Sequence, residues 1–84
     1  MNLSSYKDFI VYADNQGFVY FYNTFDNKIK KFSVTQDSTI IVNIKIIDDI
    51  LLMVAERAGY QFFIYDIKGF GETDALEPHN LMTD

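Results

Sequence analysis

Apolar residues gather along this chain in short runs that are separated by small groups of polar residues and glycine. The runs are rich in β-branched and aromatic side chains, which favour β-strands, and several of them alternate with a period of two. The breaks between them contain Asp, Asn, Ser, Lys and Gly, which are typical of turns. The pattern predicts six strands, over residues 8–13, 18–23, 29–35, 39–47, 50–55 and 60–67.

The segment 50–55, ILLMVA, would also suit a helix, because Leu and Met are good helix formers. A run of six residues between two turn signals is short for a helix, however, and this favours a strand. The expected fold class is therefore all-β. Because the connections are short, we predict a six-stranded antiparallel meander.

Two of the predicted strands are apolar on both faces. Phe18, Tyr20 and Tyr22 share one face of the strand 18–23, and Tyr60 and Phe62 share one face of the strand 60–67. A single sheet in a chain of this size can cover only one of its own faces. The other face must be buried by the chain itself or by a partner, and Tyr and Phe are favoured at interfaces. These five aromatic residues are the candidate interface.

The two halves of the chain also share a pattern. At an offset of 42, FIVYAD (residues 9–14) aligns with LLMVAE (residues 51–56), and Gly17 aligns with Gly59. One inserted residue then aligns Tyr-Asn-Thr at 22–24 with Tyr-Asp-Ile at 65–67. A self-match at about 40–45 residues is the spacing of four-stranded propeller blades. Over residues 8–68, the chain resembles the WD-repeat and related β-propeller families.

The resemblance implies two incomplete blades, each of which lacks one strand. It also implies that Asp66 helps to hold the turn of its blade and that Asn23 does part of this through its amide. Two blades cannot close a ring, since about four to eight are needed. The blades would therefore be completed by copies of the chain or by a larger protein. Otherwise the meander forms a small barrel or sandwich, and the repeat is only a pattern shared by two hairpins.

Charge divides the chain into two parts. Residues 72–84 carry four acidic residues and no Lys or Arg, whereas residues 1–71 carry eight acidic and seven basic residues, a net charge of −1. We predict a single β domain over residues 1–71 and an acidic, loosely ordered C-terminal tail over residues 72–84. A nearly neutral domain lacks the basic patch that binds nucleic acid, so we do not expect a nucleic-acid partner.

The chain contains no Cys, which excludes a disulfide framework and thiolate metal sites. Its first residues lack the pattern of a signal peptide, and no apolar run is long enough to span a membrane. We expect a cytoplasmic protein without a membrane partner.

Residues suited to catalysis or metal binding are sparse. His79 is the only histidine and lies in the predicted tail, where no Ser-His-acid arrangement can be built around it. Asp48 and Asp49 are adjacent on a turn, so their side chains point in different directions. The segment 14–17, DNQG, lacks the further acidic residues of a calcium loop. The basic cluster at 28–31 indicates an exposed strand edge. We therefore expect no enzyme activity and no metal or other cofactor.

The sequence thus favours a non-enzymatic protein–protein interaction or assembly module. It would associate with itself or with a larger protein partner through an aromatic sheet face or an open edge strand. The alternative is a small acidic viral or mobile-element inhibitor that binds and blocks a host enzyme, with acidic residues that imitate nucleic-acid phosphates.

Overall fold

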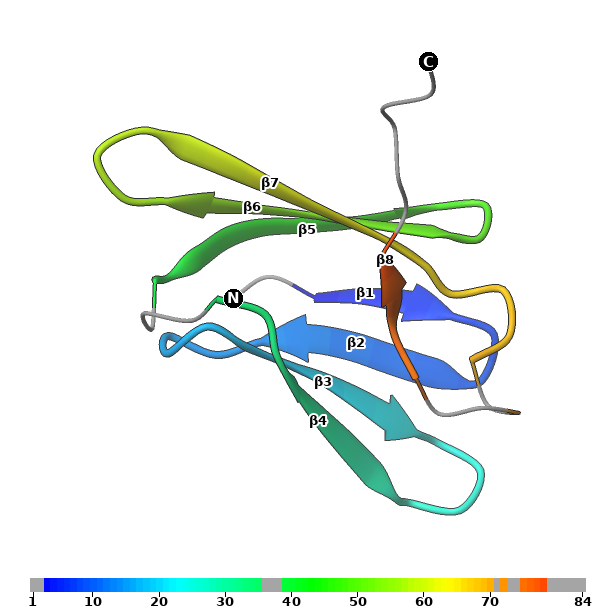
Figure 1. Ribbon diagram of the computed structural model, residues 1–84. Coiled ribbons are helices and arrows are strands. Elements are labelled where there is room, and N and C mark those ends of the chain that lie inside the picture. Colours follow the sequence, from blue (N-terminus) through cyan, green and yellow to red (C-terminus); the bar gives the residue numbers. More distant parts are fainter. Residues whose placement is uncertain (1–2, 36–38, 71, 73–74, 79–84) are drawn as a thin grey trace.

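The computed structural model consists of two antiparallel β-sheets that pack against each other (Figure 1). It describes residues 3–35, 39–70, 72 and 75–78. Each sheet has four strands that follow one another in chain order, so each sheet is a meander. The prediction of an all-β fold is confirmed: the described residues contain no helix, and their two sheets do not close into a barrel.

The first sheet, sheet A, consists of β1 (Leu3–Tyr6), β2 (Phe9–Ala13), β3 (Phe18–Asn23) and β4 (Ile29–Ser33). Lys7 opens the two-residue turn between β1 and β2 with a positive φ of 54°, which is typical of the primed turns of hairpins. Gly17, in the turn between β2 and β3, has a φ of 86°. Its carbonyl accepts a hydrogen bond from the N–H of Val34, which ties this turn to the residue that follows β4.

The second sheet, sheet B, consists of β5 (Ile41–Ile47), β6 (Ile50–Glu56), β7 (Tyr60–Asp66) and β8 (Glu77–Pro78). Asp48 opens the turn between β5 and β6 with a φ of 54°, the value that Lys7 has in sheet A. A register shift between Ile41 and Asn43 makes β5 irregular near its start. The segment 50–55, for which we predicted a strand instead of a helix, lies in β6, and β6 pairs along its length with β7.

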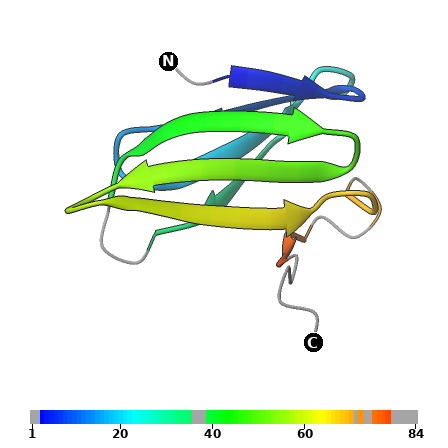
Figure 2. The ribbon, with the colours of Figure 1, turned by 90° about the horizontal axis from the view of Figure 1, so that it is seen from above.

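The core lies between the two sheets, and Figure 2 shows sheet B in front of sheet A. Val11, Val19 and Phe21 of sheet A are fully buried, and so are Leu51 and Met53 of sheet B. Successive side chains of a strand point to opposite faces, so each inner residue has outward-facing neighbours. Burying a side chain of this size contributes about 1.5–3 kcal/mol, which makes this shared core the main source of stability.

Two further contacts join the sheets, one at the edge of the core and one inside it. The Tyr6 hydroxyl, on β1, donates a hydrogen bond of 2.7 Å to the carboxylate of Asp49, in the turn between β5 and β6. Burial of Tyr6 and this hydrogen bond raise the pKa of its hydroxyl. Beyond β7, Phe70 reaches the inner face of sheet A. Its ring stacks on Phe21 at a centroid distance of 4.0 Å and meets Phe9 edge-on at 5.0 Å.

All six predicted strands are present, as β2 to β7, and the structure adds β1 and β8. β8 lies within the range assigned to the acidic tail. Of that range the structure describes Glu72 and residues 75–78, where Glu77 pairs with Asp66 and Leu76 packs against the core. The rest of the predicted tail, including His79, lies outside the described residues.

The aligned repeat segments occupy matching places in the two sheets. The segment 9–14 covers β2 and the residue after it, the segment 51–56 lies in β6, and Gly17 and Gly59 lie in the turns that follow. The N–H of Thr24 donates to the carbonyl of Asp8, and the N–H of Ile67 donates to the carbonyl of Asp49. The same chain path is therefore built twice, which gives the shared sequence pattern a structural basis.

Candidate interaction surface

Sheet B turns an apolar face away from the core. Leu51 and Met53 point inward, so the alternate residues of β6 point outward. The register places Val54 opposite Phe62 and Leu52 opposite Ile64. We define the sheet B outer face by its apolar residues on three neighbouring strands: Ile47, Ile50, Leu52, Val54, Tyr60, Phe62 and Ile64.

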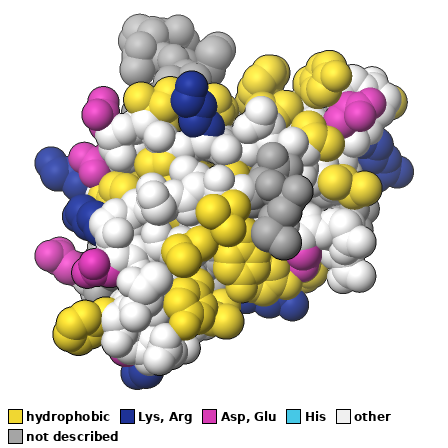
Figure 3. Space-filling view, turned by 180° about the vertical axis from the view of Figure 1, so that it is seen from behind, with side chains coloured by type: hydrophobic (Ala, Val, Ile, Leu, Met, Phe, Trp, Pro, Cys, Tyr) yellow, Lys and Arg dark blue, Asp and Glu magenta, His cyan; other side chains and the backbone are white. Residues whose placement is uncertain are grey.

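Three of these side chains are open to solvent, with exposed fractions of 51% for Ile47, 69% for Tyr60 and 65% for Phe62. Charged residues border them, because Glu56 lies opposite Tyr60 and Lys45 lies opposite Leu52. A contiguous apolar area with a polar border is typical of a binding surface, whereas single exposed apolar residues are ordinary. Figure 3 shows one side of the molecule, where hydrophobic side chains gather in groups among polar and charged ones.

The outer face of sheet A is also aromatic, but its side chains contact one another. Tyr12 and Tyr20 stack with a centroid distance of 5.0 Å, and the Tyr20 hydroxyl donates a hydrogen bond of 2.6 Å to the Asp14 carboxylate. The ammonium group of Lys31 lies 4.1 Å from the ring centroid of Phe18, a cation–π contact. The Tyr20 hydroxyl, the Asp14 carboxylate and the Lys31 ammonium group of this face therefore contact other groups of the same chain.

The Asp14 carboxylate, on the sheet A outer face, accepts three hydrogen bonds. Partial burial alone would raise the pKa of its carboxyl group, but other contacts outweigh it. Hydrogen bonds from the Tyr20 hydroxyl and from the backbone N–H groups of Gln16 and Phe18, with the charge of Lys31, lower this pKa. The hydrogen bond to Asp14 raises the pKa of the Tyr20 hydroxyl. Desolvation of this hydroxyl and the charges of Asp14 and Tyr12 raise it further. Through these hydrogen bonds, Asp14 joins the turn that follows β2 to Phe18 and Tyr20 of β3.

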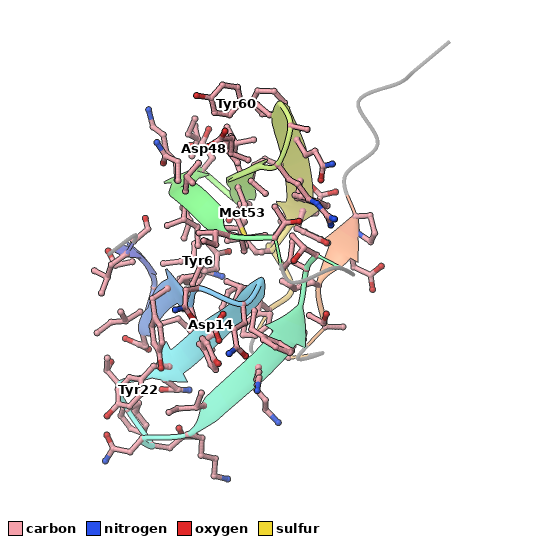
Figure 4. All side chains as sticks on the ribbon, turned by 90° about the vertical axis from the view of Figure 1, so that its left-hand side faces the viewer. Tyr6, Asp14, Tyr22, Asp48, Met53 and Tyr60 are labelled. Atoms are coloured by element: carbon pink, nitrogen blue, oxygen red, sulfur yellow. The ribbon has the colours of Figure 1, made fainter. Side chains whose placement is uncertain are left out.

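The five predicted interface residues fall on two different surfaces. Phe18, Tyr20 and Tyr22 lie half-buried on the outer face of sheet A, and Tyr60 and Phe62 lie on the sheet B outer face. Tyr22 also donates a hydrogen bond of 2.5 Å to the side-chain oxygen of Asn27. Figure 4 shows Tyr22 and Tyr60 at opposite ends of the molecule. The five residues therefore do not form one patch.

Five further residues of the sheet B outer face were not among the sequence candidates: Ile47, Ile50, Leu52, Val54 and Ile64. For β6 the signal is the period of two in residues 50–55: with Leu51 and Met53 inside, Leu52 and Val54 must point outward. Because the run is apolar at every position, the sequence did not show which set is inside.

The last strands of the two sheets, β4 and β8, leave edges that differ in charge. Sheet A ends with β4, which carries Lys30 and Lys31, and lysines discourage edge-to-edge pairing. In sheet B, β8 pairs only with Tyr65 and Asp66 of β7. Among the described residues, no strand pairs with the remaining part of β7, residues 60–64, on that side. This stretch, YQFFI, carries no charge.

Within the described ranges, no group of three or more His, Cys, Asp or Glu residues is placed to hold a metal ion. Those ranges also contain no helix that is long and apolar enough to cross a membrane.

Together, fold and surface define a class: over the described residues, the chain is a small all-β protein of two packed four-stranded meanders, and the outer face of sheet B carries exposed apolar side chains. Comparison of the chain with protein-family models, curated proteins and solved structures finds no match.

Proposed function

We propose that this protein is a non-enzymatic interaction module that binds another protein chain through the sheet B outer face. The observation that carries the proposal is Phe62, which is mostly exposed although it lies in the middle of β7. Its cross-strand neighbour Val54 extends the apolar area over the next strand.

The energetics of burial support this role. Covering a side chain such as Phe62 contributes about 1.5–3 kcal/mol, and aromatic residues often dominate the binding energy of protein interfaces. Tyr60 adds a second large ring on the same strand and the same face. Lys45 and Glu56 at the border supply both signs of charge, which suits a protein surface better than a polyanion.

The test compares Phe62→Ser with Phe25→Ser in an affinity capture from the native source. Phe25 is a matched control because it is 88% exposed and lies in the turn between β3 and β4. Far-UV circular dichroism should show that both variants keep the β fold. We expect Phe62→Ser to lose the captured protein and Phe25→Ser to retain it. Equal capture by both variants would contradict the proposal.

The alternative, an acidic inhibitor of a host enzyme, would depend on carboxylates instead. Glu72 and Glu77 are the exposed acidic residues that the structure describes in the acidic segment. Capture of an enzyme that is lost in the variant Glu72→Gln/Glu77→Gln, but not in Phe62→Ser, would favour that function.

A further inference from the structure

We infer that the open edge of β7 binds β7 of a second copy of this chain, antiparallel and across a two-fold axis. The inference rests on the proposed function and names its partner. It concerns residues 60–64, the part of β7 that lies beyond the short β8.

The first reason is the backbone of β7. On the side away from β6, β8 pairs with Tyr65 and Asp66, and no described residue pairs with the stretch 60–64 there. An edge strand presents N–H and C=O groups that pair readily with another extended chain. The flanking side chains Tyr60 and Phe62 are mostly exposed, so an approaching strand meets apolar surface at once.

The second reason is that the stretch 60–64 is complementary to itself. A two-fold axis at Phe62 places the two Phe62 rings opposite each other and places Tyr60 opposite Ile64 of the second copy. All of these side chains belong to the sheet B outer face, so the pairing joins two apolar faces into one continuous face. Cross-strand aromatic pairs of this kind are favourable.

Charge supports a second copy as the occupant. The stretch YQFFI has no charge, so no like charges meet when it pairs with itself. In the same arrangement, the turn that contains Arg57 in one copy lies just beyond Ile64 of the other copy, where β8 begins to pair. There β8 presents Glu77 beside Asp66, so charges of opposite sign lie close together at each end. By contrast, self-pairing of β4 would bring lysines together.

The experiment measures the molar mass of the purified full chain by sedimentation velocity over a wide range of concentrations. We expect the wild-type chain to form a dimer. Phe62→Lys places two ammonium groups opposite each other on the axis and should weaken the dimer at least about tenfold. The control Phe25→Lys adds the same charge at an exposed turn and should leave the dimer unchanged. Arg57→Glu should weaken it, and exchanging both charges, Arg57→Glu/Glu77→Arg, should restore it in part.

Other outcomes would overturn the inference. A dimer that Phe62→Lys does not weaken would place the contact elsewhere. A monomer at all concentrations, with a captured partner that depends on Phe62, would overturn the inference but keep the proposed function. A monomer without such a partner would overturn both. A chain shortened to end at Pro78 that dimerises, when the full chain does not, would assign the edge to residues 79–84.

Discussion

The two glycines of the repeat allow a direct test of the fold, because they have similar backbone demands but different surroundings. Both Gly17 and Gly59 have a positive φ, of 86° and 132°. An added methyl group at Gly17 would lie 1.8 Å from the Thr35 hydroxyl oxygen, whereas one at Gly59 would meet nothing within 4 Å. Gly17→Ala should therefore destabilise the protein more than Gly59→Ala.

The size of the difference follows from Thr35. A non-glycine residue held in a sparsely populated region of positive φ costs about 1–3 kcal/mol, and this cost applies to both variants. At Gly17 the buried Thr35 side chain must also move, which breaks the hydrogen bond that its hydroxyl donates to the Thr39 carbonyl. Losing such a buried bond costs a further 1–3 kcal/mol or so. Gly17→Ala should thus be about 1–3 kcal/mol less stable than Gly59→Ala.

Urea-induced unfolding, followed by far-UV circular dichroism, measures this difference. With a slope m of about 1.5 kcal/mol/M, 1–3 kcal/mol corresponds to a shift of the midpoint by roughly 0.7–2 M urea. A second measurement isolates the cause: in a Thr35→Ala background the oxygen is gone, so the added effect of Gly17→Ala should approach that of Gly59→Ala. Equal destabilisation by the two glycine variants, or no dependence on Thr35, would refute the reasoning.

Three other predictions concern stability. Tyr6→Phe removes the hydrogen bond to Asp49 between the sheets and should lower the free energy of unfolding by about 1–2 kcal/mol in urea titrations. Phe21→Ala removes a fully buried ring and should lower the free energy of unfolding by about 3–5 kcal/mol. Phe25→Ala, at an exposed position, should change it by less than about 0.5 kcal/mol. Equal effects of the two variants would contradict the assigned core. The pKa of Asp14 is lowered by folding, so its stabilising contribution is present above the ordinary pKa and is lost as the pH falls through the lower folded value. The difference in unfolding free energy between the wild type and Asp14→Asn should therefore be full near about pH 6 and should shrink on acidification; a difference independent of pH would exclude this role.

The strands were predictable from the sequence where apolar runs were long enough to show. The segment 18–23 alternates between Val19 and Phe21, which are inside, and the aromatic residues of the other face. β1 was missed because LSSY has only two apolar residues, and its pairing depends on the turn at Lys7. β8 was missed because two residues, one of them proline, carry no strand pattern.

The sequence left open which apolar face of each strand is inside. On β7, Phe63 packs against the core while Phe62 is mostly exposed, although the two residues are identical neighbours. The position of sheet A decides between them, and that position is a property of the whole fold. The sequence also did not reveal the contacts of Tyr20, a predicted interface residue, with Asp14 and Lys31 on its own sheet. Such contacts follow from strand register, which composition does not reveal.

The difference between the last strands of the two sheets explains why sheet B is the better candidate for binding. β4 pairs with β3 from Phe18 to Tyr22, so sheet A has a nearly complete fourth strand, and its lysines discourage a fifth. β8 pairs with only two residues of β7, so the same chain path ends early in sheet B. The stretch of β7 beyond it is uncharged and aromatic, and it continues into an exposed apolar face. A strand added at this edge would extend the hydrogen-bonded ladder and place its own side chains beside Tyr60 and Phe62, which favours association there over the charged edge of sheet A.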